Sequence, residues 1–142
     1  MEDIKRKNID LLVEEFWKRG YLTVSRKYGT YLPDPGKVGS FDVDIVARYK
    51  NDYAIGINLN LSDLTGSDLF SKLTFLATRH TKFSNKIVKL FVGVPAENFK
   101  QAKAIIDELE EDIRKNIKLF RIVDKSLPSV RRNRINSNVL FS

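Results

Sequence analysis

Cysteine is absent from this chain of 142 residues, which excludes disulfides, thiolate zinc sites and cysteine nucleophiles. Histidine occurs once, at His80, and a single histidine beside a predicted helix end does not support a Ser-His-Asp hydrolase. No glycine-rich phosphate loop is present, because the Gly-Lys step in "PDPGKVGS" lacks the Walker spacing and does not lead from a strand into a helix. The lack of cysteine is compatible with a reducing compartment, and we expect a cytoplasmic protein.

Long apolar runs are missing as well. No run approaches the roughly 18 residues that a membrane-spanning helix needs, and residues 1–7 are rich in charge, so we expect neither a targeting nor a membrane segment. The composition, 42% hydrophobic and 30% charged, is typical of a globular protein, and the length suits one domain. We predict a single domain over residues 1–128, followed by a basic, flexible tail over residues 129–142.

Acidic residues are scarce over most of the chain. Residues 97–112 contain six acids and two lysines, a net charge of −4. Because the whole chain carries +7, the remaining residues carry +11. No acid occurs between residues 69 and 96 or after Asp124. A segregated positive charge favours an anionic partner, most commonly nucleic acid, whereas the alternative is that the charge serves solubility alone.

The order of predicted elements indicates an α/β domain. Apolar residues spaced i, i+3, i+4 and i+7 predict a helix over residues 3–19. Runs of β-forming residues predict strands, and two further helices follow, the first capped by Ser62 or Ser67. The strands cover residues 21–28, 41–49, 53–61, 86–94 and 117–124, and the further helices cover 62–83 and 96–113. The order α-β-β-β-α-β-α-β predicts a central mixed sheet flanked by helices, with parallel pairing in its second half.

Polar residues alternate on the two strands that the turn at residues 50–52 joins. On the predicted strand 41–49, Asp42 and Asp44 lie on one face, while Phe41, Val43 and Ile45 lie on the other. On the strand 53–61, Asn58 and Asn60 share a face with Ala54 and Gly56. Antiparallel pairing would therefore bring two aspartates and two asparagines onto one surface with room for a ligand. The alternative is a solvated strand face without a binding role.

The segment "FDVDIVARYKNDYAIGINLN" resembles the core of the PD-(D/E)XK, or restriction-endonuclease-like, nucleases, and the element order of residues 2–94 resembles the archaeal Holliday-junction resolvases. The motif match covers about residues 41–60. The resemblance implies the three-layer restriction-endonuclease-like fold and a possible homodimer. It also implies a site where a strand aspartate and a following acid bind Mg²⁺, which activates water together with a lysine.

Carried over by position, the resemblance places the aspartate at Asp44, the acid at Asn58 and the lysine at Asn60, so the acid-x-Lys motif is degenerate. Asp44 and, weakly, Asn58 would be the metal ligands, and Asp42 could compensate for the missing acid. An acid of the first helix that some members use would be Asp10, Glu14 or Glu15.

Two departures from the motif weaken the predicted chemistry. An asparagine brings no charge to Mg²⁺, and Asn60 supplies no cation to stabilise the reaction. We therefore predict a catalytically inactive, nuclease-fold protein that binds DNA, with no cofactor or weakly bound Mg²⁺. The alternatives are a Mg²⁺-dependent DNA endonuclease with a variant active site and a scaffold for protein contacts.

Basic residues and one tyrosine are the candidate DNA contacts, since lysine and arginine contact phosphates without reading sequence and tyrosine stacks on exposed bases. They are Arg26, Lys27, Tyr31 and Lys37 beside the predicted site, Arg79 and Lys82 at the end of the helix predicted over 62–83, and Arg131, Arg132 and Arg134 in the tail. The alternative is a solvated helix end and a tail that serves solubility.

Overall fold

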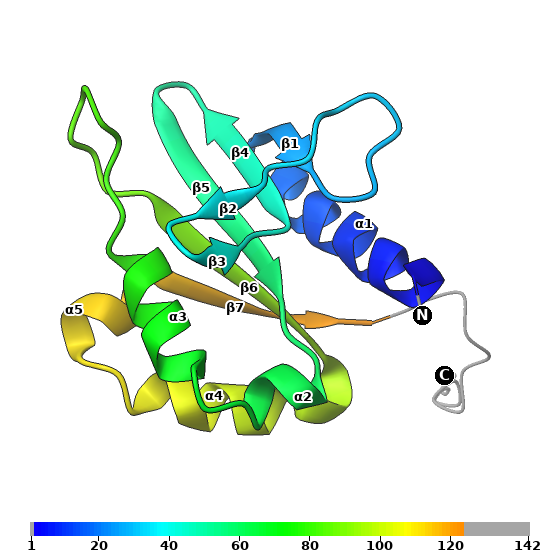
Figure 1. The fold of residues 1–142 in the computed structure, drawn as a ribbon, viewed down its shortest axis with the longest axis vertical. Helices are drawn as coiled ribbons and strands as arrows, with labels where there is room; N and C mark the ends of the chain where they lie inside the picture. Colours follow the sequence, from blue (N-terminus) through cyan, green and yellow to red (C-terminus); the bar gives the residue numbers. More distant parts are fainter. Residues whose placement is uncertain (1, 124–142) are drawn as a thin grey trace, which may run out of the picture.

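The computed structural model describes residues 2–123, and the predicted domain boundary at 128 and tail cations lie outside this range. A five-stranded mixed sheet has helices on both faces (Figure 1). In the described part of the chain, each helix is too short or too polar to cross a bilayer. The elements are α1 (Glu2–Lys18), β1 (Leu22–Arg26), β2 (Lys37–Val38), β3 (Phe41–Asp42), β4 (Ile45–Tyr49), β5 (Asp52–Asn58), α2 (Leu61–Leu64), α3 (Leu69–Ala77), β6 (Lys89–Pro95), the 3₁₀ turn η1 (Ala96–Asn98), α4 (Phe99–Asp107), α5 (Glu111–Arg114) and β7 (Ile117–Ile122).

The sheet has the strand order β1-β4-β5-β6-β7. The pairs β1–β4 and β4–β5 are antiparallel, and β5–β6 and β6–β7 are parallel. This arrangement confirms the predicted α/β class and the mixed sheet, because a tight turn joins β4 to β5 while helices connect the parallel strands.

Helix α1 covers one face of the sheet with a stripe of buried side chains. Leu12 and Phe16 are fully buried, and the Phe16 ring stacks on Phe91 of β6 with centroids 4.3 Å apart. The Phe16 ring also lies against β5 at Gly56, and this contact requires glycine, since a Cβ there would lie 2.7 Å from Cε2 of Phe16. The predicted apolar stripe thus fixes how α1 sits on the sheet.

Helices α3 and α4 cover the opposite face over a larger apolar cluster that includes Leu73, Leu90 and Ile106. The buried Asn116 ties this layer together: its Nδ2 donates to the carbonyl oxygens of Ala77 at 2.8 Å and Val88 at 2.9 Å. The two clusters share the sheet between them, so the core has three layers.

The predicted strand over residues 41–49 is interrupted, which corrects the expected alternation. β3 pairs with β2 in a separate two-stranded sheet, and the chain bends at Asp44 before β4 begins. Val43 packs in the cluster below α3 and α4, whereas Ile45 packs in the cluster below α1. These two residues therefore lie on opposite faces, because the bend shifts the register by which alternation was counted.

Other predicted strand ends shift by a few residues. The strand predicted over 53–61 ends at Asn58, so Asn60 is not on it. The strand predicted over 86–94 begins at Lys89, because residues 86–88 belong to the hairpin that follows α3.

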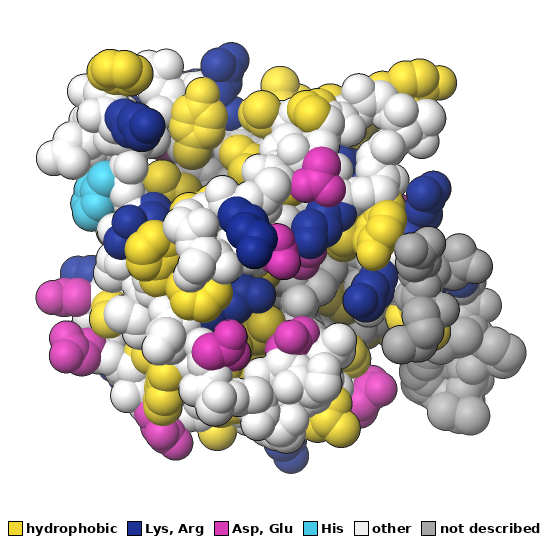
Figure 2. All heavy atoms as spheres, viewed as in Figure 1, with side chains coloured by type: hydrophobic (Ala, Val, Ile, Leu, Met, Phe, Trp, Pro, Cys, Tyr) yellow, Lys and Arg dark blue, Asp and Glu magenta, His cyan; other side chains and the backbone are white. Residues whose placement is uncertain are grey.

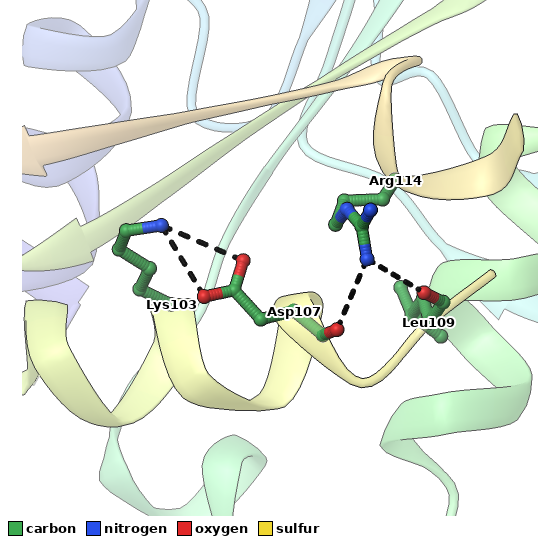
Figure 3. Close-up of polar contacts among 4 residues, drawn as sticks. All are labelled: Lys103, Asp107, Leu109 and Arg114. Atoms are coloured by element: carbon green, nitrogen blue, oxygen red, sulfur yellow. Dashed lines mark hydrogen bonds and ion pairs between the residues drawn. The ribbon is translucent and has the colours of Figure 1, made fainter. Parts of the chain in front are cut away.

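Both later helices are broken where single helices were predicted. The helix predicted over 62–83 is two helices, and α2 is capped by Asn60 instead of Ser62 or Ser67. The helix predicted over 96–113 ends as α4 at Asp107, where Nη1 of Arg114 donates to the carbonyl oxygens of Asp107 at 3.1 Å and Leu109 at 3.2 Å (Figure 3). A side chain from beyond the break thus binds the carbonyls that a continuing helix would use.

Candidate functional site

A cleft of about 270 Å³ opens where α1 meets the bend before β4, the end of β5 and the helices α2 and α3. The face with β2 and β3 in front carries lysine and arginine side chains across its middle (Figure 2). All four residues predicted from the strand pattern line the cleft, namely Asp42, Asp44, Asn58 and Asn60. The other lining residues are Lys5, Asn8, Ile9, Lys27, Tyr28, Leu59, Asp63 and Lys72.

Asp44 is the partly buried carboxyl of the cleft. Its backbone N–H donates to the carbonyl oxygen of Gly56 at 2.9 Å, and its Oδ2 accepts the backbone N–H of Asn58 at 2.8 Å. Burial raises the pKa of Asp44, because desolvation outweighs the Asn58 hydrogen bond and the nearby Lys27 and Lys72, which lower it. The adjacent strand ends thus bring Asp44 and Asn58 together, as the hairpin pattern predicts.

Asn58 ends β5 with an amide that has no hydrogen-bond partner among the described residues. Both Nδ2 and Oδ1 are buried. The amide lies against Gly93 of β6, where any side chain would collide with Oδ1. A buried donor and acceptor left unpaired cost about 1–3 kcal/mol, so such a group in a cleft is a candidate ligand contact.

Asn60 has a structural role that the strand assignment missed. Its Oδ1 accepts the backbone N–H of Asp63 at 2.9 Å and the hydroxyl of Ser62 at 2.7 Å. In return, Oδ2 of Asp63 accepts the backbone N–H of Asn60 at 2.9 Å. This capping box begins α2, and the spacing of Asn60 and Asp63 is the signal that could have located it.

The three candidate acids of α1 do not line the cleft. Oδ1 of Asp10 lies 2.6 Å from Nη2 of Arg26, and Oε1 of Glu15 lies 3.0 Å from Nη1 of Arg19. Glu14 is exposed. None of these three acids lines the cleft, whereas Lys5 and Asn8 of the same helix do. The apolar stripe predicts which face of α1 packs on the sheet, but only the tertiary structure shows that Lys5 and Asn8, rather than an acid, border the cleft.

The donor set does not fit the Mg²⁺ site that the resemblance implies. Within residues 2–123, no group of three or more histidine, aspartate or glutamate side chains is placed to hold a metal ion. Of the carboxylates at the cleft, Asp44 accepts from Asn58 and Asp63 closes the capping box. Mg²⁺ is usually held by one or two carboxylates together with waters and phosphates, and here the neutral Asn58 stands where the resemblance implies the second acid.

Some of the predicted DNA contacts bind other side chains of the protein, whereas others are exposed. The Arg26 side chain is 15% exposed in its pair with Asp10, and the Arg79 guanidinium lies 3.7 Å from the centroid of the Phe75 ring. Lys37 and Lys82 are exposed, as is Tyr31. Lys27 lines the cleft, and Arg131, Arg132 and Arg134 lie outside the described residues.

The cleft also contains cations that the motif did not indicate. Lys5 comes from α1 and Lys72 from α3, elements that are far apart in the sequence.

A comparison of the chain with protein-family models, curated proteins and solved structures found no match.

Proposed function

We propose that this chain is a DNA-binding domain of the restriction-endonuclease-like type, which holds DNA in the cleft beside Asp44 without cutting it. The observation that carries the proposal is the unpaired, buried amide of Asn58 in a cleft lined by Lys5, Lys27 and Lys72. An amide offers a donor and an acceptor to a base or sugar, and lysines bind phosphates.

The charge of the whole chain, rather than that of the cleft alone, supports an anionic ligand. Three aspartates also line the cleft, but Asp44 and Asp63 accept hydrogen bonds from backbone N–H groups. Burial additionally raises the pKa of Asp44. The acid-rich segment 97–112 forms α4 and α5, so the positive excess belongs to the remaining surface.

The arrangement of side chains favours binding over cleavage. Asn58 brings no charge, and Asn60 caps α2 through its side chain, so neither supplies the acid or the lysine of the nuclease motif. Loss of a single electrostatic contributor can lower a rate by roughly 10²–10³. We therefore favour a binding module over a Mg²⁺-dependent endonuclease.

A salt titration of DNA binding tests the proposal. We expect affinity to fall steeply between about 50 and 200 mM salt, with a log–log slope set by the phosphates contacted. Lys5→Gln combined with Lys72→Gln should weaken binding and flatten that slope by about 0.9 per lost contact. Lys103→Gln is the matched control, because Lys103 pairs with Asp107 on α4 and lies outside the cleft. No binding at low salt, or equal effects of the cleft and control variants, would contradict the proposal.

A nuclease assay separates binding from cleavage. Supercoiled DNA with Mg²⁺ or Mn²⁺ should stay uncut by the native chain. If it is cut, and Asp44→Ala abolishes the cutting, the endonuclease alternative replaces the binding module.

A further inference from the structure

A hairpin over residues 78–88 projects from the end of α3, on the side of the molecule away from α2 (Figure 1). At its tip, Phe83 has a relative exposure of 102%, so its ring has no packing role in this fold. The ring therefore has a free face for a partner.

The hairpin holds this ring on an ordered backbone. The backbone N–H of Thr81 donates to the carbonyl oxygen of Lys86 at 2.9 Å, and that of Asn85 donates to Thr81 at 3.0 Å. The hydroxyl of Thr81 accepts a further bond from the Lys86 N–H at 3.0 Å. Asn85 adopts the left-handed conformation, with φ 52°, which asparagine tolerates better than most residues. A preorganised tip loses little conformational entropy when it binds.

The surroundings of the ring are positively charged. The hairpin lies in the segment 69–96, which contains no acid, and exposed Lys82 precedes Phe83 directly. Lys86 reaches Asp52 at the β4–β5 turn, with 3.6 Å between the charged atoms, so the hairpin also contacts the sheet at that turn. An exposed aromatic ring beside an exposed lysine suits a single-stranded nucleic acid, whose bases stack and whose phosphates are anionic.

We propose that Phe83 stacks on an unpaired base while Lys82 contacts an adjacent phosphate, so that the chain prefers DNA with unpaired bases to fully paired duplex. This inference rests on the proposed DNA-binding function and adds a second contact outside the cleft. Base stacking on an aromatic side chain strengthens binding by about 5- to 150-fold per base.

A tryptophan reporter at the tip tests the contact directly. Trp17 is the only tryptophan of the chain and is itself exposed, so Trp17→Phe combined with Phe83→Trp moves the fluorophore to the hairpin. We expect a mixed-sequence single strand to quench its emission, and the blunt duplex of the same sequence to leave it nearly unchanged.

Affinity measurements on the full chain complete the test. Phe83→Ala should weaken single-strand binding by about 5-fold or more, change duplex binding little and leave Tm unchanged. Phe83→Tyr should retain single-strand binding, and Trp17→Ala is the control for loss of an exposed aromatic ring.

The outcomes distinguish this inference from the proposed function. If the chain binds duplex DNA, but a single strand does not quench the reporter and Phe83→Ala does not weaken single-strand binding, the stacking contact alone is overturned. Failure to bind either DNA at low salt overturns both proposals. A blue shift with anionic phospholipid vesicles, and no response to DNA, would reassign the tip to a membrane surface.

Discussion

Replacing Asn58 by alanine should stabilise the protein while weakening its binding of DNA. The amide of Asn58 is buried and unpaired, and its removal relieves a penalty of about 1–3 kcal/mol. Truncation leaves roughly 25 Å³ of extra space, which costs about 0.6 kcal/mol at about 24 cal/mol per Å³. The net gain is therefore about 0.5–2.5 kcal/mol, and a domain of this size gains about 4 °C in Tm per kcal/mol.

Asn116 provides the matched control, because it is also buried and its Nδ2 donates two hydrogen bonds. Asn116→Ala leaves the buried carbonyl oxygens of Ala77 and Val88 without their donor. We expect a loss of about 2–5 kcal/mol, the opposite sign to Asn58→Ala.

Thermal unfolding followed by circular dichroism, at neutral pH and without nucleic acid, measures both variants. A rise of about 2–10 °C for Asn58→Ala and a fall of about 8 °C or more for Asn116→Ala are expected. DNA affinity of Asn58→Ala should fall in the same preparations. A lower Tm for Asn58→Ala would refute the reasoning, since it would show that the folded protein satisfies this amide in solution.

Three further changes have defined outcomes. Burial raises the pKa of Asp44, so its ionisation lowers native stability. Asp44→Asn should therefore raise Tm at mildly alkaline pH, and the gain should shrink as pH falls below the native pKa and vanish below the ordinary pKa of 3.8. A pH-independent gain would contradict this cause. Gly56→Ala should lower stability by about 1–3 kcal/mol in a urea titration, because the new Cβ would lie 2.7 Å from Cε2 of Phe16; an unchanged midpoint would show that the ring moves freely. Deleting residues 129–142 removes three arginines and should weaken DNA binding and flatten its salt dependence, whereas unchanged binding would assign these residues to solubility.

Local patterns in the sequence were sufficient to predict the apolar stripe of α1, the β4–β5 hairpin and the parallel second half of the sheet. Helical and strand periodicities each report which residues share a face, and Leu12 and Phe16 are buried as their spacing predicts. The same reasoning placed Asp44 beside Asn58, because antiparallel strands joined by a tight turn have a register that the turn defines.

Only the tertiary structure decided what those residues can do. Alternation assumes an unbroken strand, and the bend at Asp44 makes Val43 and Ile45 pack on opposite faces. The orientation of α1 depends on Gly56 and Phe91, which are distant in sequence, and this packing brings Lys5 to the cleft instead of an acid. The unpaired amide of Asn58 is likewise a property of its neighbours in space, because hydrogen-bond satisfaction depends on the groups that the whole fold brings within reach.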